Sequence, residues 1–215
     1  MKPSGRSQPL ETSRAPKADS SSPFVLASAS PRRLALLRQA GLEPSVVIAP
    51  EVDEAPRKGE LPRAYALRVA VAKTEAVITK EKESFVLAAD TVVAVGRRIL
   101  PKAETEAEVE RCLKLLSGRR HVVLTGLALK PPAKPMRTRV VATRVAFKVL
   151  SKREIDAYLA SGEGIGKAGG YAVQGRAEAF VRWINGSYSN VVGLPLYETL
   201  ALLEGSGWVR GRQSA

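Results

Sequence analysis

The segment from Phe85 to Val95, with the sequence FVLAADTVVAV, constrains the fold more than any other part of the chain. It is short, strongly apolar and rich in β-branched residues, which favours a largely buried strand over a helix. Asp90 lies in its middle. An ionised carboxylate is very costly to bury alone, so Asp90 must meet a cation, a metal or the ligand-binding end of a sheet. We therefore place a candidate active site at Asp90; the alternative is that Asp90 and Thr91 merely cap a turn.

The composition indicates a globular protein with a basic surface. The chain has 215 residues, of which 45% are hydrophobic, so one sizeable core can form, although length alone also allows two small domains. Lys and Arg total 34 against 21 Asp and Glu, a formal net charge of +13. Most of this charge lies beyond residue 22. A basic folded part predicts nucleotides, nucleic acid or an acidic surface as partners, and charge does not choose among them.

The two ends of the chain and its single cysteine bear on location. Residues 1–22 are rich in Ser, Pro, Lys and Arg, which predicts a disordered extension before a domain over residues 23–208 and a C-terminal tail over 209–215. Cys112 excludes an intrachain disulfide framework, fits a reducing compartment and falls on the apolar face of a predicted helix. No apolar run approaches the ~18 residues that span a bilayer, and no signal-peptide segment is evident, so a cytoplasmic protein is expected.

A strand, a tight turn and a helix N-terminus are predicted at the start of the folded part. Residues 24–27 form the strand, and the helix is capped at Ser30 and ended by Gly41. Arg32 and Arg33 then lie in the first turn, where the helix dipole disfavours cations and backbone N–H groups are unpaired. A bound phosphate would reconcile both features; the alternative is two solvated arginines.

The rest of the chain is predicted to mix strands and helices. Capping boxes at Thr105 and Ser151 each announce a helix, ended by Gly118 and Gly162. The further predicted helices cover residues 61–78 and 195–205, and the further predicted strands cover 45–48, 121–129, 138–148, 171–175 and 180–184. The strands over 121–129 and 138–148 form a long hairpin with an exposed tip.

Two familiar patterns do not apply. The spacing of Gly164, Gly166 and Gly169 matches a dinucleotide-binding fingerprint, but it follows a predicted helix instead of a strand, and the Walker A pattern also fails. A flexible loop that presents Lys167 to a phosphate is the reading we keep. His121 is the only histidine, so a multi-histidine metal site is not expected and His121 is interpreted as structural.

Charged residues from distant parts of the chain suggest one chemistry. A helix N-terminus with two arginines, several lysines and two acidic residues suits a triphosphate bound with a divalent cation; the residues are Arg32, Arg33, Lys73, Lys102, Lys167, Glu54 and Asp90. Phosphoryl chemistry needs positive charge around the phosphates and a base that orients water. The residues by themselves therefore predict a nucleotide-processing site and no more.

Five motifs resemble those of a known family. The chain resembles the Maf family of nucleoside triphosphate pyrophosphatases, named historically for inhibition of septum formation, in its dTTP/UTP-type subgroup. The motifs occur in the family's order over roughly residues 24–204, and they are LASASPRR from Leu26, ADTV from Ala89, LLSGRRH from Leu115, KAGGYAVQG from Lys167 and NVVGLP from Asn190.

The resemblance implies a fold and an activity. The fold is a single α/β domain with a mixed, elongated sheet flanked by helices and two lobes with a cleft between them, as in Maf and ITPase-like proteins, and a homodimer is expected. The implied reaction is hydrolysis of dTTP and UTP, with modified pyrimidine nucleotides as a further class, to the monophosphate and diphosphate. It uses Mg²⁺ or Mn²⁺, needs no nucleic acid or membrane, prevents incorporation of unwanted nucleotides and is linked to cell division arrest.

The resemblance also implies a role for each matching residue. Asp90 is the proton acceptor, and Glu54 and Asp90 hold the metal. The phosphate-binding residues are Ser28, Arg32, Lys73, Lys102 and Lys167. Arg33, Thr91 and Gln174 set the preference for pyrimidines, whose carbonyl and imide edges hydrogen-bond to such side chains.

Two alternatives and two departures from the family pattern stay open. The same chemistry could act on a purine such as 7-methyl-GTP, or the chain could be a non-catalytic nucleic-acid-binding septum regulator. Lys102 is flanked by Pro101 and Ala103 where relatives more often have Gly and Pro. Gly166 stands where many relatives have an acidic residue, which puts a carboxylate near the metal in doubt.

Overall fold

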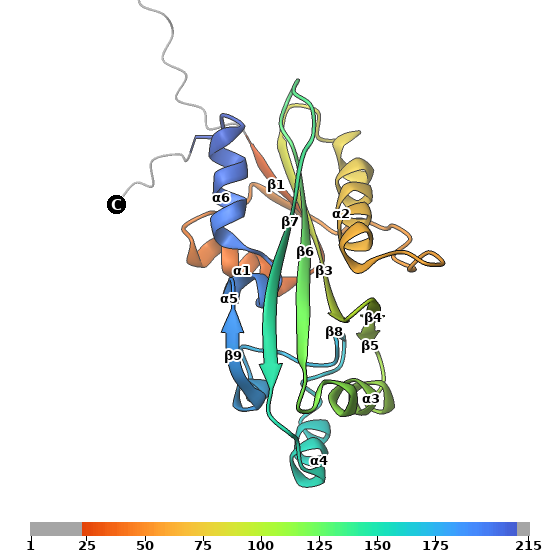
Figure 1. The fold of residues 1–215 in the computed structure, drawn as a ribbon. Coiled ribbons are helices and arrows are strands. Elements are labelled where there is room, and N and C mark those ends of the chain that lie inside the picture. Colours follow the sequence, from red (N-terminus) through yellow and green to blue (C-terminus); the bar gives the residue numbers. More distant parts are fainter. Residues whose placement is uncertain (1–22, 210–215) are drawn as a thin grey trace, which may run out of the picture.

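A mixed sheet of seven strands forms the centre of the fold (Figure 1). The computed structural model describes residues 23–209. Strand β1 pairs in parallel with β2 and β3, and the other neighbouring strands of this sheet pair antiparallel, in the order β2-β1-β3-β6-β7-β9, with β4 beside β3. The strands are β1 (Phe24–Ala27), β2 (Val46–Ile48), β3 (Phe85–Val95), β4 (Arg98–Leu100), β6 (Arg120–Lys130), β7 (Arg137–Phe147) and β9 (Val181–Asn185). The segment around Asp90 is therefore a buried strand, as predicted, and it lies near the middle of the sheet.

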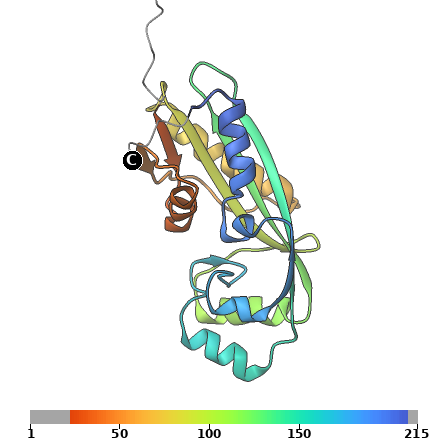
Figure 2. The same ribbon diagram turned by 90° about the vertical axis from the view of Figure 1, so that its left-hand side faces the viewer.

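Helices cover both faces of the upper part of this sheet. Figure 2 shows α6 (Leu196–Gly205) and α1 (Pro31–Gln39) on one face and α2 (Pro62–Ile78) behind the other. The lower part carries α3 (Glu106–Leu116), α4 (Lys152–Ala160), the 3₁₀ helix η1 (Arg176–Phe180) and a two-strand sheet of β5 (Lys102–Ala103) and β8 (Lys167–Ala168). Helix α5 (Tyr188–Val192) leads from β9 back to α6. In residues 23–209, no helix is long and apolar enough to cross a membrane.

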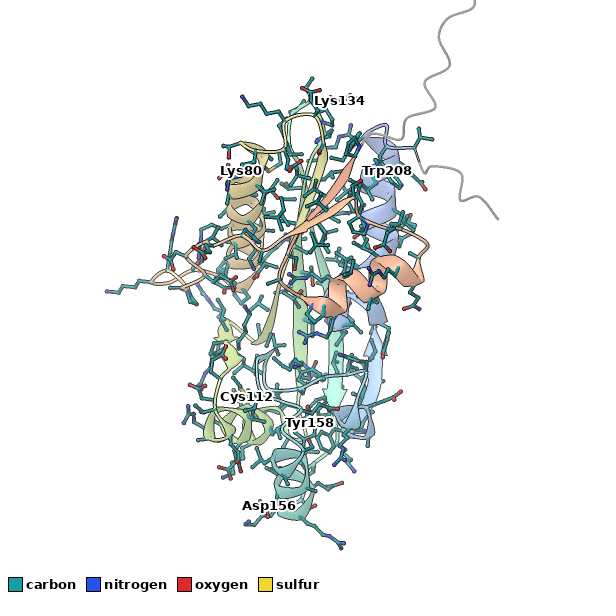
Figure 3. The ribbon with its side chains drawn as sticks, turned by 180° about the vertical axis from the view of Figure 1, so that it is seen from behind. Lys80, Cys112, Lys134, Asp156, Tyr158 and Trp208 are labelled. Carbon is teal, nitrogen blue, oxygen red and sulfur yellow. The ribbon has the colours of Figure 1, made fainter. Side chains whose placement is uncertain are left out.

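Separate hydrophobic clusters define two lobes. The upper-lobe cluster on the α1 and α6 face includes Leu37, Leu87 and Leu127, and the lower-lobe cluster includes Phe147 and Tyr158. In Figure 3, Lys80, Lys134 and Trp208 mark the upper end of the molecule, and Cys112, Tyr158 and Asp156 mark the lower end. Strands β3, β6 and β7 pass from one lobe to the other, so the lobes share a continuous sheet.

The local signals predicted from sequence are present. Both capping boxes form, because Thr105 and Ser151 each accept a hydrogen bond from the backbone of the glutamate three residues on, and that glutamate returns one. Gly118 and Gly162 have the left-handed φ values of 68° and 65° that end these helices. Cys112 is buried in the lower-lobe core, as predicted.

One predicted strand is wrong. Residues 171–175 form a turn, in which Gly175 N donates to the carbonyl of Ala172. Gly169 and Gly170 have φ values of 67° and 70°, which turn the chain away from the sheet just before this segment. Conversely, Lys167 lies in the short strand β8, paired with β5, and not in a loop without regular structure. The predicted extension over residues 1–22 and most of the predicted tail lie outside the described residues.

Candidate functional site

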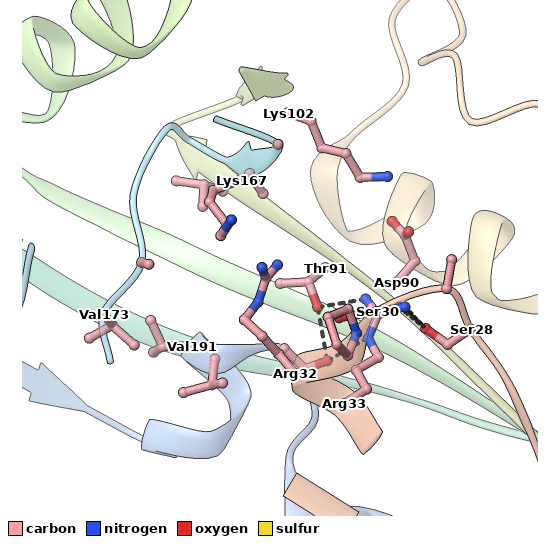
Figure 4. A pocket seen from close by; sticks show the side chains of 18 of the residues that line it. Ser28, Ser30, Arg32, Arg33, Asp90, Thr91, Lys102, Lys167, Val173 and Val191 are labelled. Atoms are coloured by element: carbon pink, nitrogen blue, oxygen red, sulfur yellow. Dashed lines mark hydrogen bonds between the residues drawn. The ribbon is translucent and has the colours of Figure 1, made fainter. Parts of the chain in front are cut away.

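A cleft of about 270 Å³ opens where the two lobes meet (Figure 4). It lies beside the carboxyl end of β1, the N-terminus of α1 and the middle of β3, with β5 and β8 on its far wall. All ten residues to which the sequence assigned roles line it: Ser28, Arg32, Arg33, Glu54, Lys73, Asp90, Thr91, Lys102, Lys167 and Gln174. The fold therefore brings together residues from six separate segments of the chain.

Asp90 is held by a lysine from the neighbouring helix. It is only 3% exposed, and its Oδ1 accepts a hydrogen bond of 2.7 Å from Lys73 Nζ. Lys73 is itself buried on the face of α2 that packs against the sheet, and its Nζ also lies 2.7 Å from Glu54 Oε1. The ammonium group thus neutralises a carboxylate in the apolar strand and joins it to a second carboxylate. The predicted cation partner of Asp90 is Lys73.

Glu54 is the second acidic residue of the cleft. Its Oε2 accepts a hydrogen bond of 2.9 Å from Lys102 Nζ, and the hydroxyl of Tyr65 donates to its backbone carbonyl at 2.8 Å. Burial alone would raise the pKa of Glu54, but the hydrogen bonds from Lys73 and Lys102 hold it at about 2. Glu54 is therefore an ionised carboxylate at neutral pH, fixed at both its side chain and its backbone.

The N-terminus of α1 is prepared for an anion. Ser30 occupies the N-cap position without a capping hydrogen bond from its side chain, and the first turn contains no acidic residue. Burial lowers the pKa of the Arg32 guanidinium, and burial followed by the nearby Arg32 charge lowers the pKa of the Lys167 ammonium. Both side chains reach into the cleft from opposite walls (Figure 4). An anion placed between Arg32 and Lys167 would stabilise both of these cations.

The side chain of Arg33 is buried, although its position in the first turn of α1 suggested that it would bind a phosphate or be solvated. It is 8% exposed, and its guanidinium donates to the Gly193 carbonyl at 2.9 Å, to Ser28 Oγ at 3.1 Å and to Thr91 Oγ1 at 3.3 Å. Burial lowers the pKa of Arg33, although the charge of Asp90 raises it. The alternative of two solvated arginines is thus wrong for Arg33. Arg33 ties the turn after β1 to β3 and to the turn between α5 and α6.

Gln174 and Gly166 lie at the edge of the cleft. Gln174 is exposed, and no hydrogen-bond partner is found for its side chain within residues 23–209, so its amide is available to a ligand. Gly166 has a φ of 68°, and a Cβ atom there would meet nothing within 4 Å. The place where many relatives have an acidic side chain is therefore open in this chain.

Four residues that matter for this arrangement were not anticipated from sequence. Thr125 and Asn190 are fully buried behind Thr91, Gly193 supplies a carbonyl to Arg33 and Thr91, and Tyr65 holds the backbone of Glu54. A threonine within a β-strand and a tyrosine within an apolar helix are ordinary core residues in a sequence. Among these four residues, Asn190 and Gly193 belong to the NVVGLP motif that resembles the family, but the motif did not indicate which residues they contact.

The carboxylates of the cleft fit a divalent metal. Glu54 and Asp90 both offer hard oxygen ligands, and each forms an ion pair with the Lys73 ammonium through one of its oxygens, at 2.7 Å. No group of three or more His, Cys, Asp or Glu side chains suited to a metal is found within residues 23–209. This donor set matches Mg²⁺ or Mn²⁺, which commonly take one or two carboxylates and complete their shell with phosphate oxygens and water.

Comparisons with known proteins identify the family that this chain resembles. The family described as "Maf-like protein" matches residues 23–206. The dTTP/UTP pyrophosphatase of Caulobacter vibrioides is 60% identical over 185 residues, covering 86% of this chain and 96% of the relative, and that of Rhodospirillum rubrum is 58% identical over 193 residues, covering 90% and 92%. Among solved structures, the Staphylococcus aureus Ham1 protein has 16% identity and a TM-score of 0.42, covering 58% of this chain and 71% of that one. That likeness is too low to support an inference.

Proposed function

Because this chain belongs to the Maf-like protein family, we propose that it hydrolyses dTTP and UTP to the nucleoside monophosphate and diphosphate. The observation that carries the proposal is the buried carboxylate of Asp90 in a cleft whose other charged groups are mostly cations. Such a cleft can bind a chain of phosphates and can also remove a proton from water. The two relatives described above, which are 60% and 58% identical to this chain, are named for this activity.

The cationic groups of the cleft bind and orient the phosphates. Arg32 and the free N–H groups of α1 approach from one wall, and Lys102 and Lys167 approach from the neighbouring strands β5 and β8 on the other. A phosphate chain between these walls relieves the repulsion between Arg32 and Lys167. It also places positive charge where negative charge develops as the diphosphate leaves.

Asp90 accepts the proton in the hydrolytic step. A water hydrogen-bonded to the carboxylate attacks the α-phosphorus, its proton passes to Asp90, and the bond from the α-phosphorus to the bridging oxygen breaks. The monophosphate keeps the water oxygen, and diphosphate carries away the bond electrons. Lys73 holds Asp90 in place through Oδ1, while no partner is found for Oδ2 within residues 23–209. A divalent metal held by Glu54 and Asp90, when bound, supplies further positive charge to the phosphates.

We attribute the pyrimidine preference to the available amide of Gln174 and to the Gly193 turn, which hydrogen bonds hold in place in the wall of the cleft. Gln174 is available to donate to and accept from a pyrimidine edge. The hydroxyl of Thr91 is already bonded to Arg33, Thr125 and the Gly193 carbonyl. Arg33 and Thr91 therefore act by fixing the Gly193 turn that lines the cleft, and a larger purine would have to displace it.

The test is diphosphate release from a panel of nucleotides. Asp90→Asn keeps the shape of the side chain but removes the base, so kcat for UTP should fall about 100-fold or more, since general bases contribute about 10²–10⁴. Asp156→Asn is the matched control, because Asp156 is an exposed residue of α4 and, among residues 23–209, its carboxylate pairs only with Lys152. It should leave kcat unchanged. Omitting the divalent metal should also abolish turnover of the unaltered protein.

Three outcomes would contradict parts of the proposal. Metal-dependent turnover of 7-methyl-GTP in preference to UTP and dTTP would show a purine enzyme with the same chemistry. Full activity of Asp90→Asn would exclude Asp90 as the base. Absence of metal-dependent turnover of any triphosphate, together with salt-sensitive binding to nucleic acid, would favour the non-catalytic alternative.

A further inference from the structure

The lower lobe has a second recess, on the sheet face opposite its hydrophobic core. It has a volume of about 430 Å³, and no residue that lines it also lines the catalytic cleft. Side chains alternate along a strand, and His121, Val123 and Val145 belong to the buried face. The intervening residues of β3, β6, β7 and β9 therefore form most of the recess, and His121 and Gly96 also contribute to its lining. The ones that matter are Ala94, Arg120, Val122, Arg144, Trp183 and Asn185.

The register of the strands builds an aromatic and cationic surface in this recess. Arg120, Ala146 and Trp183 form one row across β6, β7 and β9. Because Ala146 is small, the Arg120 guanidinium can lie over the Trp183 ring, 5.7 Å from its centroid. With Arg120 over it, the Trp183 side chain remains 37% exposed. Exposed aromatic rings on a sheet, paired with arginine, are surfaces on which nucleobases stack.

The recess carries two positive charges that a bound anion would balance. Arg144 lies in the next row, between Val122 and Asn185, so it is a diagonal neighbour of Arg120 on the same face. No acidic residue lines the recess. Within residues 23–209, neither arginine has a carboxylate or a hydrogen-bond partner. Neighbouring like charges destabilise a sheet unless a counter-charge lies between them.

We propose that this recess, which we call the sheet platform, binds a nucleotide unit separately from the catalytic cleft. The base stacks on the Arg120 and Trp183 pair, the phosphate is bound by Arg144, and the Asn185 amide offers one donor and one acceptor. The small floor residues Ala94 and Val122 leave room for a planar group. A free nucleotide and a single nucleic-acid strand both carry this chemistry. An acidic peptide would satisfy the arginines but would leave the Trp183 ring uncovered.

Trp183 itself reports on the occupant. The chain has two tryptophans, and Trp208 lies in the upper lobe beside Phe24, so a Trp208→Phe variant leaves only the platform ring. Titration with UMP and, separately, with a six-nucleotide oligouridylate should quench its fluorescence in a saturable manner. Tighter binding of the oligonucleotide identifies a strand, and equal binding identifies a free nucleotide. If Trp208→Phe fails to fold, the indole N–H signal of Trp183 in the unaltered chain serves the same titration, assigned by its loss in Trp183→Phe.

Matched variants separate the platform from the cleft. Arg144→Gln should weaken binding about tenfold, as expected for the loss of one charged hydrogen bond, and leave UTP hydrolysis unchanged. Arg153→Gln removes the same charge from an exposed position on α4 and should change neither. Lys167→Ala should impair hydrolysis and leave the quenching intact. The proposal is overturned if neither probe quenches Trp183 below millimolar concentration, if Arg144→Gln and Arg153→Gln weaken binding equally, or if Lys167→Ala abolishes the quenching. An acidic hexapeptide that quenches as well as the oligonucleotide would also overturn it.

Discussion

At the scale of single residues, the structure shows how charged and titratable groups are kept inside an apolar interior. Asp90 is compensated by Lys73, which arrives from a helix instead of from the same strand. His121 is kept neutral: it is 2% exposed, its Nε2 lies 2.8 Å from the Tyr171 hydroxyl, and its ring packs against Phe147. This confirms the structural role predicted for the only histidine. Burial lowers the pKa of His121 to about 4.

That shift predicts a pH dependence of stability. The folded pKa of about 4 lies below the ordinary value of 6.5, so between these values the unfolded chain binds more protons than the folded one. The stability is unaffected above pH 6.5 and falls as the pH drops toward 4, by about 3 kcal/mol over the window. Urea unfolding at pH 7 and pH 4.5 measures it. His121→Gln lacks the titrating group and should lose less stability; an equal loss in both proteins would exclude His121 as the cause.

At the scale of elements, the approach of α2 to the sheet decides whether the site forms. Gly126 of β6 pairs directly with Asp90 of β3, and α2 crosses at this point. A Cβ atom on Gly126 would lie 2.2 Å from the backbone oxygen of Ala66. The absence of a side chain therefore lets α2 come close enough for Lys73, two turns further along the same face, to reach Asp90.

Gly126→Ala should consequently damage both stability and catalysis. The clash is with backbone, which cannot rotate away, so α2 must shift, and we expect a loss of about 3 kcal/mol in the free energy of unfolding. The displaced Lys73 should also lower kcat. Gly205→Ala is the matched control, because a Cβ there would meet only the flexible Arg137 side chain, at 3.3 Å. Denaturant unfolding and UTP hydrolysis of both variants provide the measurement, and wild-type behaviour of Gly126→Ala would refute the packing argument.

At the scale of the whole molecule, a buried chain of hydrogen bonds connects the cleft to strand β7. Thr91 Oγ1 lies 2.9 Å from Thr125 Oγ1, which donates to the Asn190 carbonyl at 3.4 Å. Asn190 Nδ2 donates in turn to Thr143 Oγ1 at 2.9 Å. With Arg33, this chain joins α1, β3, β6, α5 and β7. It therefore couples the position of the Gly193 turn to the sheet that both lobes share.

Thr125→Val tests this coupling, since valine keeps the shape and removes the hydroxyl. We expect the KM for UTP to rise about tenfold with a smaller change in kcat, and the preference for UTP over 7-methyl-GTP to weaken, because a lost buried hydrogen bond costs about 1–3 kcal/mol. Thr125→Ser should restore both quantities. Thr138→Val, at an exposed position of β7, is the control. Unchanged selectivity in a folded Thr125→Val protein would show that Thr125 acts only in stability.

The sequence by itself determined the local structure and the residues that gather in the cleft. Capping boxes, terminal glycines and the apolar strand around Asp90 act over a few residues, so they can be recognised in a linear pattern. Seven of the ten cleft residues are charged groups that the sequence grouped by their chemistry, and the family resemblance added Ser28, Thr91 and Gln174. No local pattern indicates that segments so far apart will meet.

Only the tertiary structure decided how these residues are used. Arg33 is 160 positions away from the Gly193 carbonyl that it binds, and Thr125 is 65 positions from Asn190. Residues 171–175 have the composition of a strand, but two preceding glycines in left-handed conformations turn them away from the sheet. Such contacts depend on strand register and on how closely α2 packs. These are properties of the whole assembled sheet, because each is set by atoms that no short stretch of the chain contains.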